Sequence, residues 1–122
     1  MAHPLDRPVW NALTGRQTHL AIREGDAVRL RPDVGVFVAA RDAGATDDLE
    51  AICARYPSAG SLEAEGTPLA GWTPPEIEPT LHAVLAQMVC TRLVPGPRLE
   101  TQPLGEADAD DIYELAMLTK PG

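Results

Sequence analysis

Apolar residues recur with a helical period between residues 46 and 57. Four of them share one helix face because they follow the spacing i, i+3, i+4 and i+7: Leu49, Ile52, Cys53 and Tyr56. Thr46 is a suitable N-cap, and Asp47 and Asp48 place negative charge at the positive end of the helix. Pro57 ends the pattern. The spacing therefore predicts an amphipathic helix between Thr46 and Pro57.

Two other runs predict strands on either side of this helix. Residues 34–40 are apolar on both alternating faces, which is typical of an interior strand covered on two sides. Residues 61–64 predict a short strand after the helix. Together they give a strand–helix–strand unit with a right-handed, parallel crossover.

Outside this unit, local sequence signals predict one short helix, an irregular loop and one long strand. Asp6 followed by Pro8 marks the start of a short helix that closes near Gly15, whereas residues 17–22 are ambiguous. Residues 66–79 hold several prolines and predict an irregular loop. Residues 81–94 predict a long strand, with apolar side chains on both of its faces.

The last 25 residues predict a short strand over residues 98–104, a turn and an amphipathic helix. Asp108 can cap this helix, and Lys120 meets its negative end. Pro121-Gly122 stops it. Its apolar face is supplied by four residues, namely Ala109, Ile112, Leu115 and Ala116.

Composition limits the size of the core that these elements can build. A chain of 122 residues fits one domain, and it is 44% hydrophobic but only 4% aromatic. Alanine, valine and leucine must therefore fill the interior, and each buries less area than an aromatic ring. We expect marginal stability unless another surface completes the core.

The net charge and the absence of a signal-peptide pattern indicate which partners and which location to expect. A net charge of -8 argues against a nucleic-acid partner, where lysine and arginine must neutralise phosphates, and against anionic membranes. No apolar run is long enough to span a bilayer, and residues 1–10 lack the pattern of a signal peptide. We therefore expect a cytoplasmic protein that binds neither nucleic acid nor membrane.

Candidate chemistry is sparse. The histidines are dispersed, and the cysteines lie in apolar segments without metal-ligand spacing, so we expect no metal site and two buried thiols. Capping and solvation account for the acidic pairs, and no nucleophile elbow or phosphate loop is present. We therefore name no catalytic residue. The residues in question are His3, His19, His82, Cys53, Cys90 and the pairs 47/48, 63/65, 76/78 and 110/111.

The strand, turn and helix over residues 98–122 resemble the opening of GCN5-related N-acetyltransferases (GNAT), in particular their FR47-like subgroup. Residues 3–10 (His-Pro-Leu-Asp-Arg-Pro-Val-Trp) and 13–20 (Leu-Thr-Gly-Arg-Gln-Thr-His-Leu) look like the N-terminal region of the same group, as does Gln-Met-Val at 87–89. The resemblance implies a small α/β fold: a mixed sheet with flanking helices, followed by the first strand and helix of the catalytic half.

This resemblance implies a division into an accessory region, residues 1–97, and a truncated GNAT-type domain, residues 98–122. In that family acetyl-CoA binds a later Arg/Gln-x-x-Gly-x-Gly/Ala loop, which this sequence lacks. The resemblance thus implies no cofactor-binding residue here, although acetyl-CoA serves the complete family. By carry-over, Thr119, Lys120 and Pro121 lie at the start of the side that receives the acceptor amine.

Two functions remain open at this point. The chain is either the N-terminal portion of an acetyltransferase, inactive without its catalytic half, or a binding or regulatory module that pairs with itself or with another chain. An independent small enzyme has little support, because no activated nucleophile or acid–base pair is visible. The acceptor amine, the oligomeric state and the natural C-terminus are not encoded in these patterns.

Overall fold

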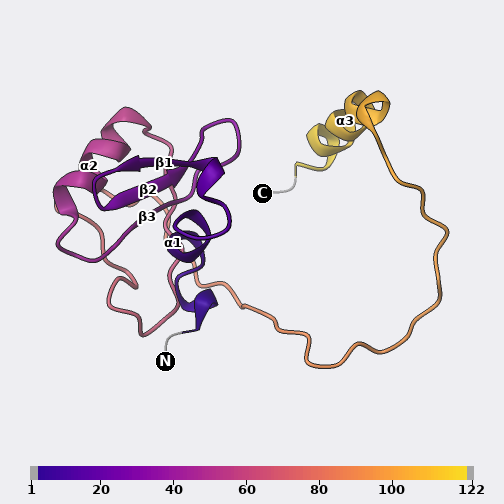
Figure 1. Ribbon diagram of the computed structural model, residues 1–122, viewed down its shortest axis with the longest axis horizontal. Coiled ribbons are helices and arrows are strands. Elements are labelled where there is room, and N and C mark those ends of the chain that lie inside the picture. The colour runs from indigo at the N-terminus through magenta and orange to yellow at the C-terminus, as the bar shows by residue number, and fades with distance from the viewer. Residues whose placement is uncertain (1–2, 121–122) are drawn as a thin grey trace. The chain divides into compact units, whose positions relative to one another are not determined.

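The computed structural model describes residues 3–120, and its chain divides into two units (Figure 1). Unit 1 spans Met1–Val84 and unit 2 spans Leu85–Gly122. The expected boundary after residue 97 rests on the resemblance and stays a prediction.

Unit 1 is built on a three-stranded sheet. Its strands are β1 (Ala21–Glu24), β2 (Ala27–Leu30) and β3 (Val38–Ala40), which lie in the order β1-β2-β3 with antiparallel neighbours. One isolated parallel bridge, between Phe37 and Gly60, extends the pairing beyond β3. The expectation of a small α/β fold is confirmed at this level.

Helices pack on both faces of the sheet (Figure 1). Strand residues alternate between faces, so β2 sends Val28 toward α1 (Pro8–Leu13) and Ala27 toward α2 (Thr46–Arg55). The α1 core consists of Val9, Leu13, Val28 and Ala39. The α2 core consists of Ala27, Val38, Ala40, Ala45, Leu49 and Ile52.

The helix predicted between Thr46 and Pro57 is confirmed, since α2 buries Leu49 and Ile52. The predicted N-cap is wrong: Ala45 occupies that position, and the Thr46 hydroxyl donates to the Ala43 carbonyl at 3.0 Å. The strand predicted over residues 34–40 is buried on both faces, but only as Val38–Ala40. A turn closed by the Val34 and Gly35 N–H groups, which donate to the Arg31 carbonyl at 2.9 and 3.1 Å, keeps the earlier residues out of the sheet.

The strand predicted over residues 61–64 is wrong. The Gly60 N–H and carbonyl bond to Val36 and Val38, but pairing stops there. Beyond that bridge, the Arg7 guanidinium donates to the carbonyls of Ala40 and Arg41 and so occupies the edge of β3. Arg7 also forms an ion pair with Glu63, with 2.9 Å between Nε and the carboxylate. Glu63 therefore bonds to Arg7 and not to the backbone of β3.

The ambiguous stretch 17–22 contains the 3-10 turn η2 (Thr18–Leu20) and the first residues of β1. A similar turn, η1 (Pro4–Asp6), precedes α1. Its N-terminus is closed by His3, whose Nδ1 accepts from the Leu5 N–H at 3.1 Å. This histidine therefore serves as a cap.

The tight link between β1 and β2 yields a prediction about Gly25. Its φ of 52° is left-handed, and a Cβ there would lie 2.4 Å from the Asp48 carboxylate. That carboxylate accepts the Asp26 N–H at 2.8 Å. We expect Gly25→Ala to lower the free energy of unfolding by about 2–3 kcal/mol, measured by urea denaturation.

Gly66→Ala is the matched control for this substitution. Gly66 also has a positive φ, 83°, but nothing lies within 4 Å of its added Cβ. Only the backbone cost of about 1 kcal/mol applies there. Equal losses in the two variants would show that the Asp48 contact is not part of the effect.

Unit 2 contains the turn η3 (Glu106–Asp108) and helix α3 (Ala109–Thr119). The predicted helix is confirmed, with Lys120 as a left-handed C-cap at φ 44°. Asp108 occupies the N-cap position, but its carboxylate accepts the Gly105 N–H at 2.8 Å. The expected stop signal at Pro121 and Gly122 lies outside the described residues.

The strands predicted over residues 81–94 and 98–104 are wrong: both stretches are irregular. A helix satisfies its backbone groups within one segment, whereas a strand needs a neighbouring strand. No strand pairs with either stretch among residues 3–120.

Candidate functional site

The residues expected on the acceptor side form no reactive cluster in the part of the chain that is described. The Thr119 hydroxyl donates to the Leu115 carbonyl at 2.9 Å, one turn earlier in α3. Lys120 is exposed beyond the helix end. Pro121 lies outside the described residues. The role implied by the resemblance therefore stays a prediction.

Several acidic side chains serve as caps or ion-pair partners, and so does His3. Within residues 3–120, no three histidine, cysteine or acidic side chains converge as a metal site would require. Glu63, expected to be solvated, is instead a buried partner of Arg7, with its side chain only 5% exposed. That pair joins Arg7, at the start of α1, to the irregular stretch that follows Gly60, so it is structural.

The two thiols differ, contrary to the expectation that both are buried. Cys53 packs against the α2 core, and burial raises the pKa of its thiol, while the charge of Arg29 opposes this shift. Such a thiol is a weak nucleophile at neutral pH. Cys90 is exposed because the strand expected around it does not form.

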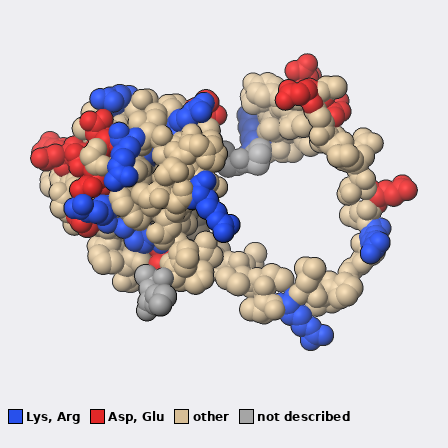
Figure 2. All heavy atoms as spheres, in the orientation of Figure 1, with Lys and Arg blue, Asp and Glu red and all other residues tan. Residues whose placement is uncertain are grey.

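Unit 2 leaves its large apolar side chains uncovered. Every residue from Leu85 to Lys120 is exposed except Asp108, and Met88 reaches 92%. The stretch before α3 is also mostly uncharged in the view of Figure 2. We call residues 85–119 the apolar segment. Its large exposed side chains are Leu85, Met88, Val89, Leu93, Val94, Leu99, Leu104, Ile112, Tyr113, Leu115, Met117 and Leu118.

The apolar face of α3 is unusually wide. At about 100° per residue, its apolar positions other than Leu118 cover an arc of about 200°, from Leu115 through Ile112 to Met117. The opposite face carries Asp110, Asp111 and Glu114, together with Leu118. A face this wide suits a helix that lies in a broad groove or on a sheet.

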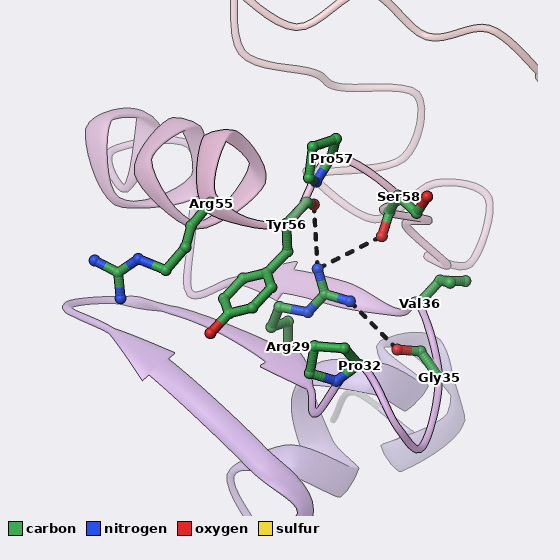
Figure 3. Close-up of a pocket in the computed structure, with 8 residues that line it drawn as sticks. All are labelled: Arg29, Pro32, Gly35, Val36, Arg55, Tyr56, Pro57 and Ser58. Carbon is green, nitrogen blue, oxygen red and sulfur yellow. Dashed lines mark hydrogen bonds between the residues drawn. The ribbon is translucent and has the colours of Figure 1, made fainter.

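Unit 1 contains a hollow of about 230 Å³, which we call the Arg29 hollow (Figure 3). Residues from β2, the β2–β3 link and the end of α2 line it. They are Arg29, Pro32, Gly35, Val36, Arg55, Tyr56, Pro57 and Ser58.

Arg29 belongs to this hollow although it is only 2% exposed. Its Nε donates to the Leu30 carbonyl at 2.8 Å, and Nη1 donates to the Tyr56 and Ser58 carbonyls at 3.2 and 3.5 Å. Nη2 donates to the Gly35 carbonyl at 3.3 Å. The guanidinium also lies 4.7 Å from the centre of the Tyr56 ring (Figure 3). These contacts fix the guanidinium between three segments.

No carboxylate pairs with Arg29 among residues 3–120. This is unusual, because a buried arginine normally has a carboxylate partner. Carbonyl dipoles and the Tyr56 ring compensate the charge in part. The arrangement holds a fixed positive charge beside an open hollow, and none of the residues that line the hollow is a carboxylate, a histidine or a cysteine.

No family model, curated protein or solved structure matches this chain. Among those described, no helix is long and apolar enough to cross a membrane.

Proposed function

We propose that this chain is the N-terminal portion of a GNAT-type N-acetyltransferase. In this account, unit 1 is an accessory module. The irregular stretch 98–104 and helix α3 belong to the start of the domain that transfers the acetyl group from acetyl-CoA to an amine, and residues 98–104 pair as a strand only when the rest of that domain is present. The chain has no acetyl-CoA loop, so it is inactive alone.

The exposure of the apolar segment is the observation that carries this proposal. Unit 1 buries its own cores, whereas residues 85–119 bury none of their large apolar side chains. An extensive exposed apolar surface is one of the marks of a site that another polypeptide covers. A strand and helix that open a domain need the rest of that domain in this way.

Titration with acetyl-CoA tests the proposal on the chain as it stands. We expect no saturable heat in isothermal titration calorimetry, because the backbone N–H groups that hold the pyrophosphate in this family come from later elements. Saturable binding at micromolar acetyl-CoA would contradict the proposal. The intact mass of the native product in its source cells gives an independent check. The proposal expects a protein roughly twice the 13.0 kDa of this chain.

The same exposed residues favour one alternative, a stand-alone module that covers the apolar segment by self-association. This alternative needs neither acetyl-CoA nor a catalytic half. Light scattering after size-exclusion chromatography distinguishes it, since a discrete dimer with a native mass of 13.0 kDa per chain supports the module over the acetyltransferase.

A further inference from the structure

The Arg29 hollow combines positive charge with apolar walls in an otherwise acidic protein. Two of its lining residues are arginines and none is acidic, although the whole chain carries 18 acidic and 10 basic residues. If charged residues were placed at random in such a chain, acidic residues would line the hollow more often than basic ones. A local excess of positive charge is a common feature of sites that bind anions.

The geometry of Arg29 is fixed before any ligand arrives. Four carbonyl contacts and the Tyr56 ring hold the guanidinium, so binding would not have to restrict a mobile side chain. Nη2 carries two hydrogens, and the described residues offer it one acceptor, the Gly35 carbonyl. One donor therefore remains for a further acceptor.

Arg55 adds a second, adaptable cation at the rim of the hollow. In Figure 3 its guanidinium points away from Arg29, with the Tyr56 side chain between the two, so Arg55 must turn toward the hollow to share an anion with Arg29. Arg55 pairs with Glu24 at 3.3 Å, and its side chain is largely exposed. An exposed pair of this kind contributes little free energy, so the arginine can turn to another anion at small cost.

We propose that the Arg29 hollow binds a small ligand with an oxyanion headgroup, a carboxylate or a phosphate, through Arg29 and Arg55. Guanidinium groups form their strongest hydrogen bonds with such oxyanions. Pro32, Val36 and Pro57 supply apolar walls for the body of the ligand. This site is separate from the apolar segment and does not depend on the acetyltransferase proposal.

Amide chemical shifts of the full chain test this site. The probes are sodium phosphate and sodium butyrate, each titrated at an ionic strength held constant with sodium chloride. We expect saturable shifts at the amides of Gly35, Tyr56 and Ser58. Saturation by butyrate alone would identify the headgroup as a carboxylate, and saturation by phosphate alone would identify it as a phosphate.

Two variants decide whether the arginines are responsible. Arg55→Gln should raise the dissociation constant about fivefold or more, because it removes one charge-assisted contact. Arg31→Gln removes the same charge from an exposed residue that does not line the hollow, and it should leave the constant unchanged. Shifts that never saturate with either anion, or equal binding by wild type and Arg55→Gln, would overturn the proposal.

Discussion

Arg29→Met is expected to lower the free energy of unfolding by about 3–4 kcal/mol. Methionine fills much of the same volume but donates no hydrogen bond, so the carbonyls of Leu30, Gly35, Tyr56 and Ser58 lose their donor. An acceptor left unpaired in a fully buried place costs about 1–3 kcal/mol. The cost per carbonyl is lower here, because Leu30, Gly35 and Tyr56 are only half-buried and Ser58 is exposed to water. Urea denaturation followed by tryptophan fluorescence measures the loss.

Arg31→Met is the matched control. Arg31 lies two residues further along the same chain segment, but it is exposed and its side chain bonds only to Asp33. We expect its free energy of unfolding to equal that of wild type. If Arg29→Met were as stable as Arg31→Met, the guanidinium would not be holding β2, the β2–β3 link and the end of α2 together.

Ile52→Ala is expected to lower the free energy of unfolding of unit 1 by about 3–4 kcal/mol, whereas Leu115→Ala leaves it unchanged. Ile52 is 1% exposed within the α2 core, and truncation there leaves a cavity. Leu115 is 62% exposed on α3. Both tryptophans, Trp10 and Trp72, pack against the cores of unit 1, so their fluorescence reports that unit.

Comparison of these two variants shows whether the free energy of unfolding of unit 1 depends on α3. Unit 1 should respond to its own core alone, because the apolar segment has no packed residues to lose. A loss above about 1 kcal/mol in Leu115→Ala would mean that α3 is buried in solution, contrary to the exposure on which the proposed function rests.

Both longer helices follow from the sequence because a helix depends on local spacing. The apolar stripe predicted α2, and the acidic first turn and apolar face predicted α3. The burial of β3 on both faces was also predicted, since consecutive apolar residues leave no side for water.

Strand pairing could not be predicted in the same way. The same alternation that suits a strand at residues 84–90 gives an irregular stretch here, because a strand needs a partner that local spacing does not specify. Residues 61–64 do not form a strand beside β3, because the side chain of Arg7 donates to the carbonyls of Ala40 and Arg41 at the end of β3. Arg7 is far from these residues in the sequence. The hairpin of β1 and β2 was not predicted at all.

The Arg29 hollow was also missed, although one signal for it exists. Arg29 stands between Val28 and Leu30 in a short apolar run, and a charge in such a run is buried when both faces of the strand are covered. Its carbonyl partners come from as far away as Ser58, so only the fold reveals them.

Hydrogen–deuterium exchange on the full chain tests the division between the two units most directly. We predict strong protection at the amides of β2, β3 and α2. Residues 85–104 should exchange at the rate of an unstructured peptide, and α3 should be only weakly protected, because an isolated helix of this length is marginal in water. Protection of residues 85–119 equal to that of β2 in the chain alone would contradict the account, since the apolar segment would then have a core of its own.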